Sequence, residues 1–284
     1  MSPLRQAFIN TMELKNYSPA TIKSYTGCIV QLAKFYNLCP SKLSDEQIQR
    51  WFLYAKKEKQ LSLSSLKQRC FACKLFYQEI LARDIGHLDF SKGAKTIKKL
   101  PIVLNRQEVH DILQEIKKPQ YKLMLALLYG CGLRVSECCH LRTSHIDWSR
   151  QRLNVVKGKG GYHRSLPLAN SLQVALEQFT HKMGSDEAIF KGRYREYYCA
   201  GSLQKVIKLA SEACPNITKE VTSHVFRHSF ATHLLEGGIS LALVQKYLGH
   251  QHLRTTEIYL HVTDDIQVNA REILDQMLVD ALSE

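Results

Sequence analysis

The sequence predicts a mainly α-helical protein of two domains, an N-terminal four-helix bundle and a C-terminal mixed α/β domain that holds a small antiparallel β-hairpin or sheet. Three observations lead to this fold class. Apolar residues recur at helical spacing from Ser2 to Arg83, this periodicity then fails in a lysine-rich stretch, and one later segment has the two short runs and glycine-rich turn of a β-hairpin. The 284 residues suffice for two domains of about 100–200 residues each.

Helix start signals divide the first segment, residues 1–85. Ser18 before Pro19 reads as an N-cap followed by proline at the first helical position. A capping-box pattern follows at Ser44, with glutamine three residues later. Apolar residues recur at helical spacing after each signal, and again in a helix that is expected from about Ser64. These patterns predict a bundle of about four helices.

The lysine-rich stretch separates the two domains. From Gly86 to Leu104 the composition shifts to four lysines, two glycines and a proline, and no helical period is visible. We therefore expect an inter-domain linker at residues 86–101, with the second domain over residues 102–284. Its lysines suit a strap across nucleic-acid phosphates, although a plain solvated linker has a similar composition. They are Lys92, Lys95, Lys98 and Lys99.

Another capping-box pattern opens the second domain, where Asn105 is followed by Glu108. An apolar helix is then expected to end at Gly130. Just beyond it, Arg134 and Glu137 are three positions apart, so they share a face if this segment is helical. Such a pair usually lies on the surface. Because its neighbours here are apolar or small, we expect an arginine that a carboxylate holds in place.

The β-hairpin is expected at residues 152–167, with its turn from Gly158 to Gly161. Lys157 precedes this turn and Lys159 lies within it. A lysine on a hairpin tip is normally solvated, yet such a tip can also reach into a groove. Further helices are expected at about 171–182, 201–213, 222–237 and 240–248. The final stretch, 264–282, alternates acids with apolar residues and predicts an amphipathic helix with an acidic outer face.

Charge is distributed unevenly along the chain, whose formal net charge is +13. Residues 1–100 carry 17 Lys and Arg against 7 Asp and Glu, and residues 101–263 carry 21 against 13. Residues 264–284 carry one Arg against six acids, a net charge of −5. Two basic segments are typical of a protein that neutralises backbone phosphates along double-stranded DNA. Lys67 and Arg69 add candidate DNA contacts on the bundle, where a solvated helix surface is the alternative.

Composition also argues against several classes of protein. No apolar run approaches the roughly 20 residues that a membrane helix needs, and MSPLRQAFIN lacks the features of a secretory signal, so we expect a cytoplasmic, DNA-associated protein without a membrane partner. The nine cysteines are expected to be reduced and mostly buried. Cys70 and Cys73 form an isolated CxxC pair, and the consecutive Cys138, Cys139 and His140 cannot converge on one ion. We expect neither a metal nor a cofactor.

Phosphate chemistry is indicated by four residues in one short stretch, His224, Arg227, His250 and Tyr259. Breaking a phosphodiester without a metal requires donors to the non-bridging oxygens, an in-line nucleophile and a proton for the leaving oxygen. Arginine suits the first task because its planar guanidinium grips phosphate through two parallel hydrogen bonds. Arg134 supplies a second arginine upstream. Histidine can add a donor or take the tyrosine proton, whose ordinary pKa is about 10.

These residues resemble the tyrosine site-specific recombinases, the family of phage integrases, Xer and integron-type recombinases. The matching strings are GLRVSE with Arg134, GKG with Lys159, HVFRHSFATHLL with His224 and Arg227, and LGHQHLRTTEIYLH with His250 and Tyr259. They occur in the family's order between residues 130 and 261. The bundle at residues 1–85 also looks like the helical core-binding domain of that family, so the resemblance covers nearly the whole chain.

The resemblance implies a role for each matched residue. Arg134, His224, Arg227 and His250 would surround the scissile phosphate. Tyr259 would attack it to give a 3′-phosphotyrosyl link, and Glu137 would orient neighbouring groups. Lys159, which the alignment of GKG favours over Lys157, would protonate the leaving 5′-oxygen. No ATP would be needed, because the covalent intermediate keeps the phosphoester energy. Four protomers would act on two DNA recombination sites as a homotetramer, with the C-terminal helix at 264–282 docked on a neighbouring subunit.

Other functions fit parts of the same pattern. A catalytically inactive DNA-binding protein accounts for the charge, the bundle and the linker, but it needs no complete set of site residues. A type IB topoisomerase-like enzyme uses similar chemistry, yet the compact two-domain plan favours recombination. A zinc hydrolase is indicated only by His224 and His228 at helical i, i+4 spacing, and no glutamate stands between them. The acidic segment has its own alternative, docking on the same chain.

Overall fold

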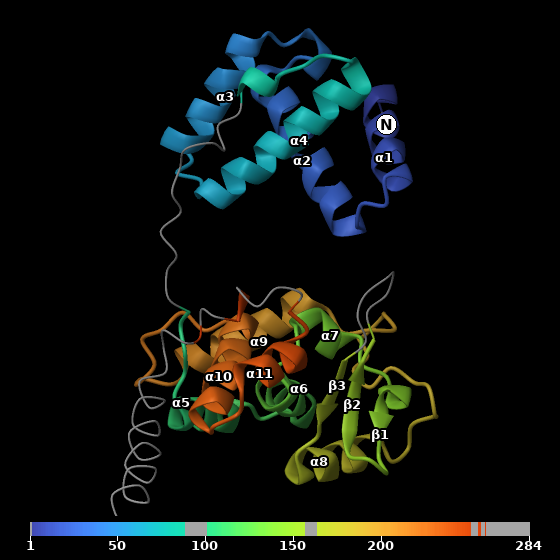
Figure 1. Cartoon of the computed structure of the whole chain (residues 1–284), viewed down its shortest axis with the longest axis vertical. Coiled ribbons are helices and arrows are strands. Elements are labelled where there is room, and N and C mark those ends of the chain that lie inside the picture. Colours follow the sequence, from blue (N-terminus) through green and yellow to red (C-terminus); the bar gives the residue numbers. More distant parts are fainter. Residues whose placement is uncertain (1, 89–100, 157–163, 251–254, 257–258, 260–284) are drawn as a thin grey trace, which may run out of the picture. The chain divides into compact units, whose positions relative to one another are not determined.

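The computed structural model describes residues 2–88, 101–156, 164–250, 255, 256 and 259. Two compact units make up the chain, one over residues 1–98 and the other over residues 99–284 (Figure 1). Helices dominate both units, and the strands form one small antiparallel sheet in the second. The predicted fold class is confirmed. In the described parts of the chain, no helix is long and apolar enough to span a membrane.

Within its described residues, the N-terminal unit consists of four α-helices and two short 3-10 turns. They are α1 (Pro3–Leu14), α2 (Pro19–Tyr36), α3 (Asp45–Lys57) and α4 (Leu63–Leu81), with turns at Pro40–Lys42 and Gly86–Leu88. Side-chain caps start these helices as the sequence predicts. Ser18 caps α2, and Ser44 and Gln47 cap α3 reciprocally. Helix α4 begins at Leu63, just before the predicted start, because Ser62 is the residue that caps it.

Helix α4 forms the centre of the N-terminal unit, where it packs against α1, α2 and α3. Its Phe76 meets Phe8 of α1 edge to face, with ring centroids 5.2 Å apart. Tyr77 is fully buried, and its hydroxyl donates to the Pro40 carbonyl at 2.8 Å, which compensates the burial of a polar group. Each buried side chain of this size contributes about 1.5–3 kcal/mol, so the bundle has a core of its own.

The C-terminal unit combines helices with a three-stranded sheet. Its elements are α5 (Arg106–Glu115), α6 (Pro119–Gly130), α7 (Val135–Cys139), a 3-10 turn at Thr143–His145, β1 (Ile146–Asp147), β2 (Arg152–Val155), β3 (Arg164–Pro167), α8 (Asn170–Thr180), α9 (Ala200–Glu212), α10 (Ser223–Glu236) and α11 (Leu241–Leu248). Strands β2 and β3 are the predicted hairpin, and they pair with Leu153 opposite Leu166. The two-residue β1 is too short to leave an alternating pattern in the sequence.

Helix α10 runs through the core of the C-terminal unit, against α6 and α11 (Figure 1). Its buried side chains include Phe226 and Phe230. Because neighbours cover α10 on more than one face, it lacks the one-sided apolar pattern of a surface helix. Its first two turns also carry His224, Arg227 and His228. The fold thus places these three polar side chains on a rigid, largely buried element.

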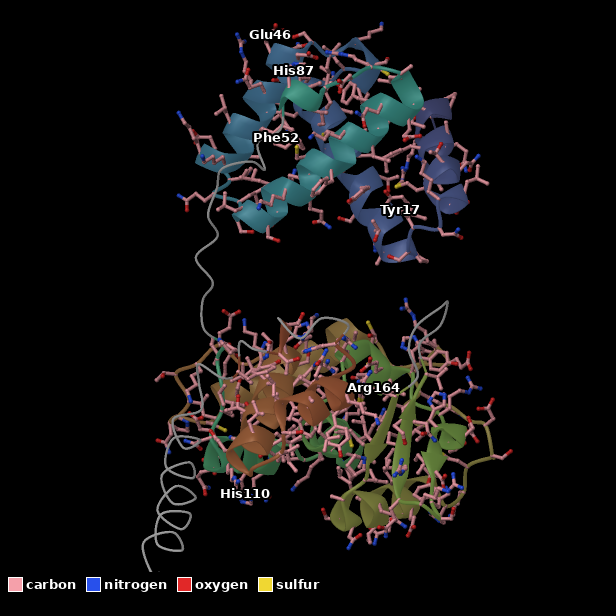
Figure 2. All side chains as sticks on the ribbon, viewed as in Figure 1. Tyr17, Glu46, Phe52, His87, His110 and Arg164 are labelled. Atoms are coloured by element: carbon pink, nitrogen blue, oxygen red, sulfur yellow. The ribbon has the colours of Figure 1, made fainter. Side chains whose placement is uncertain are left out.

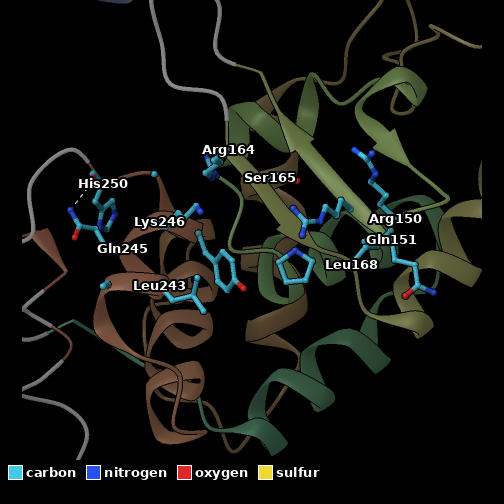
Figure 3. A pocket seen from close by; sticks show the side chains of 14 residues that line it. Arg150, Gln151, Arg164, Ser165, Leu168, Leu243, Gln245, Lys246 and His250 are labelled. Atoms are coloured by element: carbon cyan, nitrogen blue, oxygen red, sulfur yellow. Dashed lines mark hydrogen bonds between the residues drawn. The ribbon is translucent and has the colours of Figure 1, made fainter.

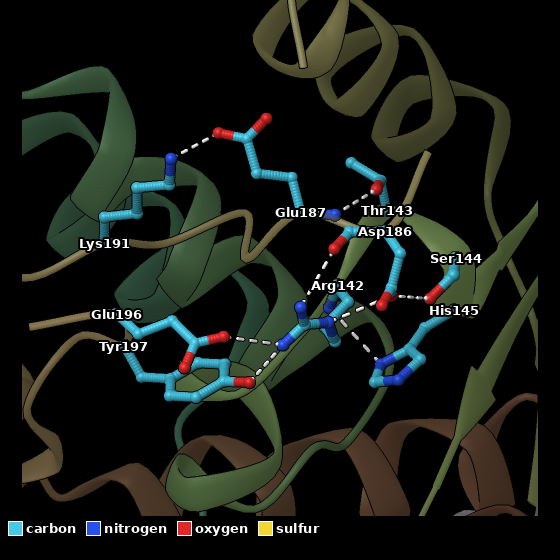
Figure 4. Close-up of polar contacts among 9 residues, drawn as sticks. All are labelled: Arg142, Thr143, Ser144, His145, Asp186, Glu187, Lys191, Glu196 and Tyr197. Atoms are coloured by element: carbon cyan, nitrogen blue, oxygen red, sulfur yellow. Dashed lines mark hydrogen bonds and ion pairs between the residues drawn. The ribbon is translucent and has the colours of Figure 1, made fainter. Parts of the chain in front are cut away.

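A network around Arg142 fixes the long connection between α8 and α9 (Figure 4). The Arg142 Nε donates to Asp186 Oδ1 at 2.9 Å, and its Nη1 donates to Glu196 Oε1 at 2.8 Å. The same guanidinium contacts the Tyr197 hydroxyl, and the Ser144 hydroxyl donates to Asp186 at 2.5 Å. Solvent screens these ion pairs because both carboxylates are largely exposed. The network therefore mainly determines the course of the connection.

The cysteines match the expectation of reduced, mostly buried thiols. None of the nine forms a disulfide, and seven of them are buried. Cys70 and Cys73 belong to the core of the bundle, and Cys138 and Cys139 to that of the C-terminal unit. Among the residues that the structure describes, no group of three or more His, Cys, Asp or Glu side chains is arranged to hold a metal ion.

Candidate active site

Arg227 is the buried centre of a polar cluster in the C-terminal unit, with 4% of its surface exposed. Its Nη1 donates to the Gly132 carbonyl and its Nη2 to the Leu248 carbonyl. Gly132 has a φ of +56°, and a Cβ there would lie 2.4 Å from the Phe230 ring, so only glycine fits this close approach. Burial is the main cause that lowers the Arg227 pKa, followed by the charges of Arg134 and Arg164. A guanidinium still remains charged at neutral pH.

His250 lies beside Arg227 because Gly249 ends α11 in the left-handed conformation, with a φ of +62°. The His250 Nε2 is 3.2 Å from Arg227 Nη2, and its Nδ1 is 2.9 Å from the Thr256 hydroxyl. Since a guanidinium can only donate, Nε2 accepts and the proton resides on Nδ1, which donates to Thr256. Burial first, and then the nearby arginines, lower the His250 pKa to about 4. The imidazole is therefore neutral at physiological pH.

Glu137 joins two arginines at the edge of the cluster. It accepts from Arg134 Nη1 at 2.9 Å and from the Arg134 backbone N–H at 2.8 Å. Arg164 lies at the start of β3 in the C-terminal unit (Figure 2). It donates hydrogen bonds to both carboxylate oxygens of Glu137, from Nη1 at 2.8 Å and from Nη2 at 2.7 Å. Burial alone would raise the Glu137 pKa, but these charge-assisted hydrogen bonds outweigh it and hold the pKa at about 2. Glu137 is thus a carboxylate that fixes both guanidinium groups.

Tyr259 packs against α10 and α11 and is 1% exposed. Its hydroxyl is 2.9 Å from His228 Nδ1, and the two rings lie 5.5 Å apart. Burial raises the Tyr259 pKa, while the charges of Arg227 and Arg134 oppose that rise. The His228 pKa is lowered to about 4, first by burial and then by His224 and Arg227. A protonated phenol therefore faces a neutral imidazole at physiological pH.

The structure brings together most of the residues that the sequence predicts around the phosphate. Hydrogen bonds and charge interactions join five of them into one cluster, namely Arg134, Glu137, Arg227, His250 and Tyr259. His224 is exposed on the first turn of α10, next to this cluster.

Two other predicted residues belong to the N-terminal unit. On α4, Lys67 and Arg69 are partly exposed, with the Arg69 guanidinium 5.2 Å from the Trp51 ring centroid. Outside the described residues lie Lys159, the linker residues Lys92, Lys95, Lys98 and Lys99, and the segment 264–282.

Three residues of the cluster were not singled out as site residues by the sequence. His228 directly follows Arg227, and one helical turn after His224 it faces the same side of α10. Arg164 follows the glycine-rich turn and is buried, as is Leu166 two residues later in the same strand. This alternation is the only sign in the sequence that the Arg164 side chain points inward. Thr256 stands three residues before Tyr259. Each had a local signal, but the partners of His228 and Arg164 are distant in sequence, at Tyr259 and Glu137. Thr256 contacts His250 only six positions away, and no pattern in the sequence marks that contact.

A cleft of about 860 Å³ opens beside the cluster, between the sheet and α11 (Figure 3). Its cationic lining residues are Arg150, Arg152, Arg164 and Lys246, and His250 stands at its edge next to the cluster. Among the described residues that line it, none is an aspartate or a glutamate. The cleft therefore has a positive lining that suits an anionic group or segment.

Sequence comparison gives family matches over both units. Residues 103–265 match the phage integrase family, and residues 4–87 match the phage integrase N-terminal SAM-like domain. A putative integrase/recombinase y4qK of Sinorhizobium fredii is 30% identical, over 92% of this chain and 85% of that protein. Tyrosine recombinase XerA of Pyrococcus horikoshii is 33% identical, over 92% of this chain and 90% of that protein.

Solved structures show the same fold. The crystal structure of XerA recombinase aligns with a TM-score of 0.54 and 26% identity, over 96% of this chain and 97% of that one. The XerH site-specific recombinase, bound to a palindromic difH substrate in a post-cleavage complex, aligns with a TM-score of 0.69 over 92% of this chain and 82% of that one. With 19% identity, this second likeness concerns the fold alone.

Proposed function

This chain belongs to the phage integrase family of tyrosine recombinases, which carry out site-specific DNA recombination, and we propose that Tyr259 is its nucleophile. The enzyme is thus a DNA strand transferase, as the resemblance of its motifs implies. One observation supports the assignment of Tyr259 most strongly. Its phenol stands in the same buried cluster as Arg227 and Arg134, whose charges act on it. Phosphate-binding groups and a nucleophile thus occur at one place.

We propose the following strand cleavage. The Tyr259 Oη attacks the scissile phosphorus, and the bond from phosphorus to the 5′-oxygen breaks, leaving a 3′-phosphotyrosyl link. Lys159 gives a proton to the departing 5′-oxygen, which becomes a hydroxyl. Arg134 and Arg227 stabilise the charge that develops on the non-bridging oxygens. This electrostatic stabilisation is stronger in a water-poor site than in bulk water. Rejoining reverses these steps with a 5′-hydroxyl of another strand, and no ATP is consumed.

The two remaining site histidines, His224 and His250, would complete the phosphate contacts. The His250 Nε2 accepts a hydrogen bond from Arg227 and offers no proton. Binding of an anionic phosphate favours the protonated imidazole and raises its pKa, so Nε2 becomes a donor as substrate arrives. Glu137 acts indirectly, because it keeps the Arg134 side chain in a fixed orientation.

Trapping the covalent intermediate tests this function. We define the site duplex as a nicked duplex enriched from random-sequence DNA by repeated binding to the protein. The protein is expected to form a covalent adduct with it, and excess EDTA is expected to leave the yield unchanged because arginines supply the charge stabilisation. The adduct is measured by gel shift under denaturing conditions. If EDTA stopped cleavage, the role of the two arginines would be wrong.

The alternatives to recombination are not favoured. A DNA-binding protein without catalysis needs no tyrosine among buried arginines, and the relatives compared above are named integrases and recombinases rather than topoisomerases. We place the protein in the cytoplasm with its DNA substrate. The bundle and the linker would hold the duplex through phosphate contacts from Lys67, Arg69, Lys92, Lys95, Lys98 and Lys99. The XerH structure, with its bound difH substrate, supports DNA as the partner.

We further propose a homotetramer on two recombination sites, in which the acidic segment 264–284 of one subunit binds a neighbour. Charge complementarity supports the cationic cleft as its receptor. The segment has a net charge of −5, and the cleft is lined by Arg150, Arg152 and Lys246 beside the cluster. Docking there would place one subunit's segment next to His250 of another. Binding to the same chain is the competing arrangement.

Deleting residues 264–284 is expected to leave binding to a single site within about twofold but to weaken pairing of two sites about tenfold or more, since each lost kcal/mol of contact costs about fivefold. Arg152→Glu is expected to weaken pairing similarly. Combining Arg152→Glu with the deletion is expected to add little, because both changes remove the same contact. Arg193→Glu, outside the cleft, is the matched control. Native gels with two labelled duplexes measure pairing, and unchanged pairing after deletion would contradict docking between subunits.

A further inference from the structure

The hydroxyl of the proposed nucleophile contacts a residue to which the family resemblance assigns no catalytic role. His228 Nδ1 lies 2.9 Å from the Tyr259 Oη, within hydrogen-bond distance. His228 stands on α10 immediately after Arg227, so its backbone is fixed by the packing of that helix. Its ring also packs against the Tyr259 ring, at an interplanar angle of 53°. Helix packing thus holds the histidine, and Tyr259 is held by its packing against α10 and α11.

We propose that His228 is a catalytic residue, which holds the Tyr259 hydroxyl and takes its proton as the tyrosine attacks. This inference rests on Tyr259 being the nucleophile. The Oη–H bond breaks and its proton moves to Nδ1, while an Oη lone pair forms the bond to phosphorus and the electrons of the breaking bond leave with the 5′-oxygen. In rejoining, the proton returns from Nδ1 to the departing phenolate.

The state of each partner fits this proton transfer. His228 is neutral at physiological pH, because burial, His224 and Arg227 all disfavour its cation. A neutral imidazole whose Nδ1 lacks a proton accepts from the phenol. Before attack the phenol of Tyr259 is a weaker acid than the imidazolium of His228. The proton therefore moves only as the Oη–phosphorus bond forms. The negative charge of bound phosphate assists, since it stabilises the imidazolium that results.

The other site histidines are less suited to this step. His250 already accepts from Arg227 at Nε2 and donates to Thr256 from Nδ1, so both its nitrogens are engaged. His224 is exposed, and none of the hydrogen bonds found among the described residues joins it to Tyr259. Within the described parts of the chain, His228 is therefore the imidazole in contact with the reacting oxygen.

Helix α10 also contains a matched control. Its His233 has Nδ1 2.8 Å from the Tyr129 hydroxyl, a second histidine–tyrosine pair with nearly the same separation. Its histidine lies on the same helix, and the pair has the same chemistry and is partly buried, but among the described residues no hydrogen bond joins it to Arg227 or Tyr259. A substitution there reproduces the structural cost of losing such a contact without touching the reacting atoms.

The test measures single-turnover adduct formation on the site duplex from pH 6 to 8.5. Wild type is expected to show a much shallower dependence on pH than variants without this base, because its base is already neutral. His228→Ala and His228→Asn are expected to cleave about 100-fold more slowly, with rates that rise about tenfold per pH unit as phenolate replaces the lost base. His233→Asn is expected to match wild type. Added imidazole is expected to restore part of the His228→Ala rate.

A duplex with sulfur in place of the scissile 5′-bridging oxygen separates base from acid. A thiolate leaves without protonation, so Lys159→Ala is expected to recover on it and His228→Ala is not. Three results would each overturn the role of His228. They are wild-type rates in both His228 variants, a flat pH profile in a slow His228 variant, and recovery of His228→Ala on the sulfur duplex. An adduct that persists in Tyr259→Phe would instead overturn the proposed function, which makes the two failures distinguishable.

Discussion

Tyr259→Phe is expected to abolish covalent protein–DNA adducts while DNA affinity stays within about threefold of wild type. The substitution removes the attacking oxygen, whereas affinity for DNA comes mainly from phosphate and groove contacts elsewhere. It also leaves His228 Nδ1 without the phenol at 2.9 Å, which is expected to cost about 1 kcal/mol of unfolding free energy. Denaturing gels on the site duplex measure the adduct, and native gels measure binding.

Tyr129→Phe is the control for this experiment. It removes a hydroxyl that contacts a histidine of the same helix at 2.8 Å, so its structural cost is expected to be similar. Its adduct yield is expected to equal that of wild type. An adduct of undiminished yield in the Tyr259→Phe variant would show that another residue attacks.

Loss of the Glu137 ion pairs is expected to have the largest effect on stability. Arg164→Ala removes two of the four hydrogen bonds to a carboxylate whose side chain is 9% exposed, so a charge is left poorly compensated. We expect a loss of about 3 kcal/mol in unfolding free energy, together with slower cleavage as Arg134 loses its fixed orientation. Arg152→Ala, an exposed arginine of the same sheet, is expected to change stability by less than about 0.5 kcal/mol.

The same carboxylate is expected to make stability depend on pH. Its pKa is about 2 in the folded chain, below the ordinary value of about 4.3, so the unfolded chain binds the proton more readily. The contribution, on the order of 3 kcal/mol, is complete above about pH 5 and is lost as pH falls towards 2. Urea unfolding at pH 7, 5 and 3 is expected to show a shallower pH dependence for Glu137→Gln than for wild type. Parallel curves would contradict this account.

Local signals predicted most of the fold. The helices of the bundle begin at serine caps or prolines that act over three or four residues, and the hairpin alternates over four residues on each side. The additional strand β1 has two residues and exists only because Ile146 pairs with Leu153. Its formation therefore depends on the tertiary contact rather than on a local pattern.

The candidate site was predictable as a set of residue types, but its connections were not. Arg134, Arg227, His250 and Tyr259 stand in recognisable strings, whereas two of the acceptors of Arg227 are backbone carbonyls that no motif identifies. The bond between Arg164 and Glu137 spans 27 positions and depends on the approach of β3 to α7. Hydrogen bonds of this kind follow from packing, which a single sequence does not display.

The two carbonyl contacts of Arg227 have a consequence for how this protein can evolve. The guanidinium joins the end of α11 to the loop before α7, so the group proposed to bind phosphate is also a tie within the fold. Even Arg227→Lys cannot span both carbonyls with the same planar geometry. In a descendant that has lost catalysis, replacing this arginine would still lower the stability of the fold. The arginine is therefore expected to persist in inactive descendants for structural reasons.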